Sequence, residues 1–290
     1  MVSFAADSSL SQCAIFCAKD SKACMATLSD ERTGQCLFFN STLTGRETDS
    51  DDGMVYLERM PDCCYWTGSS RSSADQSSIY KDCQDAFEKG ERNSGAVYTL
   101  RPNPNWRLIR AVCQFDHESG WTLIQRRLDG SVGFHRGWVE YVDGFGYLDK
   151  EYWIGLEAMF YLTRVNQKLS VYLEAHDGES RTANYSSFYI DDAEAGYTNH
   201  INGYTGDVED SWAEQHNGMN FSAFDNDKDL SELNCAEKYK GGWWFSGCGP
   251  SNLNGLWIEG GKSSGVRGIL WKKWKGYQYS LKVVHLLLGR

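Results

Sequence analysis

The residues best suited to chemistry are three aspartates on alternate positions of one short segment, FDNDKDLSEL. They are Asp225, Asp227 and Asp229. Carboxylates spaced in this way on a loop can converge on one hard cation, and Ca²⁺ takes about six to eight oxygen ligands. The EF-hand pattern does not fit, because Leu230 stands where that loop requires glycine and Ala236 where it requires glutamate. The segment therefore predicts either another kind of calcium loop or a solvated acidic turn.

Catalytic motifs are absent from the sequence. It contains no GxSxG elbow, no HExxH zinc motif and no phosphate loop, and His117-Glu118 is not followed by a second histidine at the required spacing. The six histidines are scattered along the chain. We therefore expect a protein that is not an enzyme.

A basic segment near the C-terminus, Lys272–Lys282, interleaves lysines with aromatic residues, and Lys262 and Arg267 precede it. Cations beside aromatic rings can contact sulfated or sialylated glycans through charge and stacking. The alternative is a strand or loop that buries its aromatic side chains and exposes its lysines. Because the formal net charge of the chain is -10, this basic patch is local, and we do not expect a nucleic-acid partner.

Cysteine usage indicates an oxidising compartment. The ten cysteines are even in number and form no CxxC pair, which favours disulfides over a zinc site. Three glycosylation sequons agree with this, and they begin at Asn40, Asn184 and Asn220. No apolar run reaches the roughly 18 residues of a membrane span, so membrane insertion is not expected. We expect a secreted or extracellular protein.

A serine-rich stretch at Trp66–Ser78 divides the chain and is typical of a flexible connector. We predict a small module at residues 1–62, a linker at 63–80 and a larger domain at 81–290. The adjacent linker cysteines, Cys63 and Cys64, favour interchain disulfides and a homodimer, because a bond between neighbouring cysteines is strained. The alternative is one bond back to the N-terminal module and one free thiol.

The first segment combines a predicted helix with a predicted strand. Cys13 and Cys17 are four residues apart, which places both sulfurs on one face of a helix capped by Ser9 or Ser11. Cys36 begins the apolar CLFF run, a predicted strand. This pattern resembles the PAN/apple module, in which a helix is stapled to a small sheet. The resemblance implies the disulfides Cys13–Cys36 and Cys17–Cys24.

The second segment carries several long motifs. Lys81–Pro102 predicts a helix that begins at Asp82, then a turn and a strand, and Leu169–His176 alternates apolar and polar residues as a half-buried strand does. Together with the blocks Gly120–Glu157 and Asn217–Trp257, these motifs resemble a fibrinogen C-terminal domain. The resemblance extends over Lys81–Gly289.

The resemblance implies an α+β fold of three subdomains. A small N-terminal subdomain is clipped by Cys83–Cys113, a central twisted sheet is mainly antiparallel, and a loop-rich subdomain is clipped by Cys235–Cys248. The resemblance also assigns calcium ligands, namely the side chains of Asp227 and Asp229 and the carbonyl oxygens of Ser231 and Leu233. Two charged ligands predict weak affinity, with a Kd of about 10⁻⁴–10⁻³ M.

The resemblance further implies a ligand pocket beside the calcium loop. In acetyl-binding relatives such as the ficolins and tachylectins, aromatic walls hold the methyl group, and backbone amides beside the second cysteine bind the carbonyl oxygen. Tyr239 and Tyr277 fall on two of the aromatic positions, and the Gly247–Cys248 peptide falls where the family has a cis bond. The alternative is ordinary aromatic packing, which applies to Tyr239, Trp243, Trp244 and Tyr277.

Three positions depart from the family's pocket. Gly249 replaces a histidine, Gly265 replaces an aromatic residue, and Val266 replaces the aspartate with which fibrinogen holds a peptide amine. The first hypothesis is a calcium-dependent, lectin-like protein of innate immunity that binds glycans or acetylated ligands on microbial or self surfaces. The second is a protein–protein ligand or adhesion factor whose fibrinogen-like domain docks a cell-surface receptor. The two glycines weaken the first hypothesis and leave the second unchanged.

Overall fold

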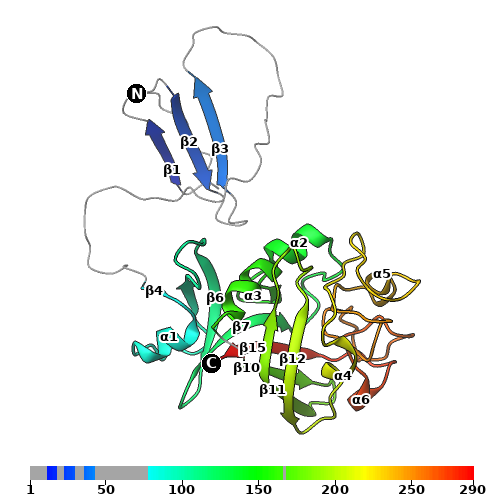
Figure 1. The fold of residues 1–290 in the computed structure, drawn as a ribbon. Coiled ribbons are helices and arrows are strands. Elements are labelled where there is room, and N and C mark those ends of the chain that lie inside the picture. The colour runs from blue at the N-terminus through cyan, green and yellow to red at the C-terminus, as the bar shows by residue number, and fades with distance from the viewer. Residues whose placement is uncertain (1–11, 18–22, 30–35, 43–77, 166–167) are drawn as a thin grey trace. The chain divides into compact units, whose positions relative to one another are not determined.

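The computed structural model describes residues 12–17, 23–29, 36–42, 78–165 and 168–290. The chain separates into two compact units, Met1–Thr67 and Gly68–Arg290. In the first unit, three described strands form an antiparallel sheet in the order β1-β2-β3. They are β1 Gln12–Cys17, β2 Ala23–Ser29 and β3 Cys36–Thr42 (Figure 1).

The segment Gln12–Cys17 is a strand, so the helix predicted around Cys13 and Cys17 is wrong. Residues four apart share one face of a helix and equally one face of a strand, so this cysteine spacing does not discriminate between them. The adjacent Ile15 and Phe16 favour a strand. The backbone register sets Cys17 opposite Cys24. The PAN/apple assignment and its two disulfides stay predictions, and Cys63 and Cys64 lie outside the described residues.

The second unit contains all six described helices and the other described strands. The helices are α1 Cys83–Glu88, α2 Trp138–Asp143, α3 Leu156–Thr163, α4 Ala213–His216, α5 Cys235–Tyr239 and α6 Lys272–Lys275. The longer strands are β5 Val97–Leu100, β6 Ile109–Phe115, β7 Gly120–Arg127, β10 Lys168–Glu174, β11 Ser180–Ile190, β12 Asn199–Gly206 and β15 Val283–Gly289. The two-residue strands are β4 Ile79–Tyr80, β8 Phe145–Gly146, β9 Tyr152–Trp153, β13 Ser251–Asn252 and β14 Leu270–Trp271.

A ten-stranded sheet forms the centre of this unit, with the main path β12-β11-β10-β15-β7-β6-β5-β4. All of these neighbours pair antiparallel except β4 and β5. Strand β10 has one buried face, because Leu169, Val171 and Leu173 point into the core while the residues between them are partly exposed. This alternation fixes the pairing of β10 with its neighbouring strands, since a shift by one residue would expose the apolar side chains. The predicted strand at Leu169–His176 and the mainly antiparallel sheet are thus confirmed.

Helix α1 begins where the sequence predicts. The side chain of Asp82 caps it by accepting a hydrogen bond of 2.7 Å from the backbone N–H of Asp85. The helix ends before Gly90, whose φ of +97° suits glycine. A disulfide joins its first residue, Cys83, to Cys113 on β6, which is one of the two pairings expected in this unit. Helix α1 lies at one end of the unit, and the loops that carry α5 and α6 lie at the other (Figure 1).

The C-terminal loops are packed around a buried aromatic cluster. It consists of Trp153, Trp212, Phe221, Trp243 and Trp244, each at most 1% exposed. The ring centroids of Trp212 and Trp243 are 4.6 Å apart, and the indole N–H of Trp244 donates to the carbonyl oxygen of Tyr197. Trp243 and Trp244 therefore belong to the core, as the packing interpretation holds, and have no surface for a ligand.

Strand β7 anchors these loops to the sheet. The amide of Gln125 donates to the carbonyl oxygen of Leu253 at 2.9 Å and to the side chain of Asn254 at 3.0 Å. Arg127 donates from Nη1 to the carbonyl oxygen of Gly255 at 2.7 Å. All of these partners are buried. Polar side chains of the sheet thus substitute for the backbone pairing that irregular loops cannot provide.

Candidate functional site

The acidic segment Phe224–Leu233 is a loop that leads into helix α5. Two hydrogen bonds fix its ends, because the backbone N–H of Lys228 donates to Ser222 Oγ at 3.0 Å and the Asn234 amide donates to the carbonyl oxygen of Phe224 at 2.9 Å. Ser222 is itself fully buried. The loop is therefore held to the domain from both sides.

In the structure, Asp225 has different contacts from Asp227 and Asp229. Asp225 accepts a hydrogen bond of 2.7 Å from the backbone N–H of Trp138, the first residue of helix α2. Asp227 and Asp229 instead stay together, since Asp227 Oδ1 accepts a bond of 3.2 Å from the backbone N–H of Asp229. Asp225 therefore supports a helix start, and the other two carboxylates form the acidic pair of the loop.

Asp227 and Asp229 are neighbouring carboxylates, so they repel each other and their oxygens can bind a cation. Asp229 accepts bonds of 2.8 Å from the backbone N–H groups of Ser231 and Cys235. Partial burial raises the pKa of the Asp229 carboxyl, these N–H groups oppose the rise, and the neighbouring Asp227 carboxylate adds to it. A cation beside the pair would remove this repulsion.

Backbone oxygens complete the predicted donor set. Among the described residues, no hydrogen bond ends on the carbonyl oxygen of Ser231 or of Leu233. No group of three or more His, Cys, Asp or Glu side chains is arranged around a metal position in the described ranges, so a site here relies on carbonyl oxygens. Two carboxylates and two unused carbonyls are hard oxygen donors, and they fit Ca²⁺ rather than a softer metal.

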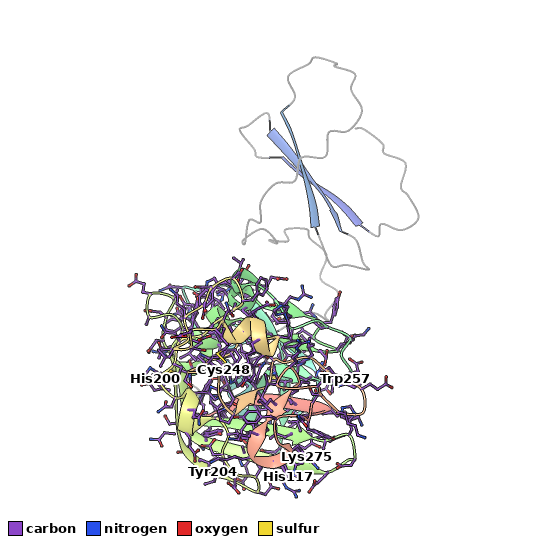
Figure 2. The ribbon with its side chains drawn as sticks, turned by 90° about the vertical axis from the view of Figure 1, so that its right-hand side faces the viewer. His117, His200, Tyr204, Cys248, Trp257 and Lys275 are labelled. Atoms are coloured by element: carbon purple, nitrogen blue, oxygen red, sulfur yellow. A yellow bond between two sulfur atoms is a disulfide. The ribbon has the colours of Figure 1, made fainter. Side chains whose placement is uncertain are left out.

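The predicted ligand pocket lies directly behind this loop. A disulfide joins Cys235, the first residue of α5, to Cys248. This is the second disulfide expected in this unit, and Cys248 is labelled in Figure 2. The backbone N–H of Leu230 donates to the carbonyl oxygen of Ser246 at 2.8 Å. This contact ties the acidic loop to the segment Ser246–Gly249 directly, and the bond from Cys235 to Asp229 ties the loop to the residue whose disulfide reaches Cys248.

The two predicted aromatic residues have different exposures. Tyr239 is 5% exposed, and its hydroxyl donates to the carbonyl oxygen of Gly249 at 3.4 Å. Burial raises the pKa of Tyr239 to about 12, and the nearby Tyr277 phenol adds to this shift. Tyr277 is 38% exposed, and Lys272 Nζ lies 4.9 Å from its ring centroid. Tyr239 can therefore form the base of a shallow site and Tyr277 one wall.

The predicted cis bond between Gly247 and Cys248 is wrong, because every peptide bond in the described part of the chain is trans. The chain turns here through left-handed backbone instead, with φ of 71° at Cys248 and 131° at Gly249. The backbone N–H groups of Cys248 and Gly249 donate to no acceptor in the described ranges. Two free donors thus lie beside Tyr239.

Gly249 stands where the family has a histidine, and a buried histidine from another part of the chain lies next to it. Sequence reasoning missed this contact. His216, at the end of α4, is fully buried, and its Cε1 atom would lie 2.3 Å from a Cβ atom added to Gly249. Its Nδ1 atom lies 2.7 Å from the carbonyl oxygen of Trp244, and Nε2 accepts from the backbone N–H of Ser251 at 3.3 Å. No local pattern relates positions 216 and 249, so the sequence carried no signal for this contact.

Gly265 leaves the opposite wall open. A Cβ atom at this position would meet nothing within 4 Å, and its φ is 115°. The loop nevertheless lies close to Tyr277, because the backbone N–H of Ser263 donates to the carbonyl oxygen of Gln278 at 3.0 Å. Tyr239 and His216 therefore fill the space next to Gly249, and the space next to Gly265 is open.

The basic segment Lys272–Lys282 is largely neutralised by carboxylates. Lys273 pairs with Glu214 at 2.6 Å, Lys275 with Glu179 at 2.7 Å and Lys282 with Glu174 at 3.4 Å. Lys272 instead lies over Tyr277, next to the predicted pocket. The charge available for an anionic glycan is therefore that of Lys272 and of the exposed upstream residues Lys262 and Arg267, and the other lysines of the segment support the structural alternative.

The sequons have different surroundings. Asn184 lies in the middle of β11 with its side chain partly exposed. The Asn220 side chain accepts a bond of 2.6 Å from the Thr198 hydroxyl, and Ser222 of the same sequon is fully buried. The folded domain can therefore accommodate a glycan more readily at Asn184 than at Asn220. Asn40 lies in β3.

Comparisons with known proteins agree with this geometry. Residues 79–289 match the family described as fibrinogen beta and gamma chains, C-terminal globular domain. Techylectin-5A from Tachypleus tridentatus is 39% identical over 215 residues, which cover 71% of this chain and 72% of that protein. Angiopoietin-related protein 2 from Mus musculus is 38% identical over 251 residues, or 85% of this chain. The chain spans only 50% of the length of that relative.

Solved structures show the same fold. The fibrinogen-like globe domain of human ANGPTL2 superimposes with a TM-score of 0.70 at 41% identity, and the match covers 72% of this chain and 98% of that one. Lamprey fibrin D-dimer, solved with the peptide Gly-His-Arg-Pro-amide, gives a TM-score of 0.69 at 31% identity over 77% of this chain and 78% of that one. None of the described helices is long and apolar enough to cross a membrane. The chain therefore belongs to the family of the fibrinogen C-terminal globular domain, whose members act in recognition or as ligands and not as enzymes.

Proposed function

We propose that the second unit is a calcium-stabilised recognition domain of a secreted protein, and that it binds glycans or acetylated ligands. One observation carries the proposal: the backbone N–H of Leu230 in the acidic loop donates to Ser246, next to the two free backbone donors, and Asp229 accepts from Cys235, the disulfide partner of Cys248. Order in the loop is thereby transmitted to the ligand segment. The role of calcium is to hold this geometry rather than to contact the ligand.

The calcium ligands in this proposal are the carboxylates of Asp227 and Asp229 and the carbonyl oxygens of Ser231 and Leu233. Water fills the remaining positions, since Ca²⁺ takes about six to eight oxygens. The ion supplies positive charge that offsets the repulsion between the two carboxylates. The chain's own contribution is the pair of N–H bonds from Ser231 and Cys235, which fix the orientation of the Asp229 carboxylate.

The ligand in this proposal carries an acetyl group. The backbone N–H groups of Cys248 and Gly249 bind its carbonyl oxygen, and the rings of Tyr239 and Tyr277 contact its methyl group. Lys272, over the Tyr277 ring, adds attraction for an anionic substituent. The relative Techylectin-5A, at 39% identity, supports this proposal.

A second candidate function is a protein ligand that docks a cell-surface receptor. The observation in its favour is a set of exposed apolar side chains within the acidic loop itself, where Leu230 is 74% exposed, Leu233 61% and Phe224 40%. Exposed apolar side chains grouped in this way are typical of protein interaction sites. The similarity to angiopoietin-related protein 2 supports this alternative.

An array of glycans and N-acetylated amino acids separates these functions. We expect calcium-dependent binding of acetylated ligands, lowered at least about tenfold by Tyr277→Ala, because this removes the exposed aromatic wall. Tyr147→Ala is the matched control, since Tyr147 is 60% exposed and contributes nothing to the pocket. Binding to no acetylated or acidic glycan would exclude the lectin proposal, and retention of cell binding by the same sample would then favour the receptor ligand.

Calcium binding is tested by thermal denaturation in calcium and in chelator. At a calcium concentration ten times the Kd, we expect about 1.4 kcal/mol of stabilisation, or a rise in Tm of roughly 3–6 °C. The double variant Asp227→Asn and Asp229→Asn keeps the hydrogen-bond acceptors and removes the charges, so it should lose this rise. The control Asp149→Ala with Glu194→Ala removes two exposed carboxylates elsewhere and should keep it. Equal melting temperatures of the wild type with and without calcium would contradict the proposal.

The same proposal extends to assembly through Cys63 and Cys64. Disulfides between two chains at these cysteines would join two weak sites in one homodimer and increase avidity. A dimer band on a non-reducing gel that disappears on reduction tests this, and a monomer band under both conditions would point to the internal pairing.

A further inference from the structure

A cleft of about 290 Å³ lies apart from the site described above, between the start of β6 and the segment from the end of α2 to β9. None of its lining residues belongs to the acidic loop Phe224–Leu233 or to the segment between Cys235 and Cys248. It is lined by Arg107, Leu108, Ile109, Arg110, Asp143, Gly144, Phe145, Gly146, Leu148, Tyr152, Trp153 and Ile154.

The floor of this cleft is backed by rigid core residues. Tyr152 is 3% exposed, Trp153 1% and Ile154 9%, and all three belong to the central core. Strand β9 pairs with β7 and with β8, which holds Tyr152 and Trp153 in register on both sides. Leu108, at the opening, is 44% exposed. The cleft thus offers a fixed surface, partly polar and partly apolar, to an entering side chain.

The opening of the cleft carries two cations without acidic partners. In the described part of the chain, the Arg110 side chain forms neither a hydrogen bond nor an ion pair, and Arg107 only stacks over Trp106, with its Cζ atom 5.3 Å from the ring centroid. Arg101, also exposed, lies beyond the end of β5, one position past the pair Leu100–Ile109. The backbone register thus brings Arg101 near the start of β6, while Arg107 and Arg110 are the arginines of the lining.

The other charged groups at the cleft do not cancel these arginines. Asp143 is the one acidic residue of the lining. Arg126 lies nearby, but its guanidinium is already used, since Nε donates to the carbonyl oxygen of Lys150 at 2.5 Å and Nη2 to that of Leu148. The local balance is positive on a chain whose net charge is -10. Elsewhere many cations pair with carboxylates, as Lys273, Lys275 and Lys282 do.

We propose that this cleft binds an acidic peptide segment of a partner protein, with one apolar side chain in the cleft and flanking carboxylates on Arg107 and Arg110. A guanidinium binds a carboxylate in bidentate geometry, which suits exposed arginines on either side of an apolar contact. The volume lies at the lower limit of ligand pockets, about 300–1,000 Å³, so it admits a single side chain rather than a large ligand. A nucleic acid does not fit, because the overall negative charge repels a polyanion.

The site is tested with the full chain and short fluorescent peptides. The probe is Glu-Asp-Phe-Asp-Glu, and two comparison peptides replace its Phe by Gly or its acidic residues by Lys. We expect binding of the first peptide, weakened at least about tenfold by either change and by added salt. If the glycine peptide binds as well as the phenylalanine peptide, the cleft plays no part and the proposal is wrong.

Two double variants assign the binding to this surface. Arg107→Glu with Arg110→Glu should reduce peptide affinity at least about tenfold. Lys81→Glu with Lys168→Glu changes the charge equally at exposed positions outside the cleft and should leave affinity within about twofold. Equal losses in both double variants would overturn the proposal. Arg110→Gln alone, at a side chain with no partner to lose, gives the same test if the double charge reversal disturbs folding.

The outcome is independent of the proposed calcium and acetyl site. Peptide binding should persist in chelator and in the variant Asp227→Asn with Asp229→Asn, because no cleft residue belongs to that loop. Binding that disappears with these changes would place the peptide on the acidic-loop surface and contradict the cleft. Failure of the glycan array would leave this result unaffected.

Discussion

Replacing Glu151 with Gln should lower the free energy of unfolding by about 3–5 kcal/mol. Glu151 is fully buried and lies 3.5 Å from Nε of Arg127, which is 1% exposed. The substitution keeps the size of the side chain but leaves the guanidinium buried without a counter-charge. Burial already lowers the pKa of Arg127, and Glu151 is the main group that opposes this. Urea denaturation with an unchanged m-value measures the loss.

The effect should reach the ligand site, because Arg127 also holds the carbonyl oxygens of Leu253 and Gly255 at the base of the C-terminal loops. Glu140→Gln is the matched control. Glu140 pairs with Arg136 at 2.7 Å, but both side chains are more than a third exposed, so we expect a loss below about 1 kcal/mol. Similar losses in the two variants would show that the buried pair contributes no more than a surface pair.

Acidification from pH 6.5 to pH 4 should destabilise the domain through His216. Burial lowers the pKa of His216 to about 4 in the folded state, below its ordinary value of 6.5. Between these values the unfolded chain binds a proton that the folded chain does not, so stability falls as the pH falls. One such group accounts for about 3 kcal/mol over the window. His285 on β15, with a pKa also lowered to about 4 by burial, acts in the same direction.

The physical cause is the hydrogen bonding of the neutral ring. With Nδ1–H donating to Trp244, Nε2 accepts from Ser251, and protonation would remove that acceptor. His216→Asn should therefore reduce the slope of stability against pH by about one proton in this window. His117→Asn, at an exposed histidine, should leave the slope as in the wild type (Figure 2). An unchanged slope in the His216 variant would contradict the assignment.

Local patterns predicted several elements correctly. The Asp82 cap, the alternation in β10 and the mainly antiparallel sheet are confirmed, because a cap depends on residues three positions apart and a half-buried strand on a period of two. The helix at Cys13–Cys17 failed for the same kind of reason. A spacing of four fits both a helix face and a strand face, and no second signal separated them.

The candidate site shows where local reasoning ends. The sequence placed three aspartates together, but only the fold assigns Asp225 to helix α2, whose first residue is 87 positions away. The substitution at Gly249 suggested a missing pocket wall, and the structure shows that the His216 ring fills the space beneath it. The basic segment suggested an anion site, and most of its lysines are paired with distant carboxylates.

The acidic loop Phe224–Leu233 is the feature on which sequence and structure bear most directly. The residue pattern carries the family resemblance and the acidic loop, because both rest on residue types at short spacing. The resemblance in turn implies the disulfides Cys83–Cys113 and Cys235–Cys248, which are confirmed. The tertiary structure alone decided which charges are neutralised, which backbone donors stay free and which arginines stand at the cleft. These properties depend on contacts between segments far apart in the chain, and no local pattern encodes such contacts.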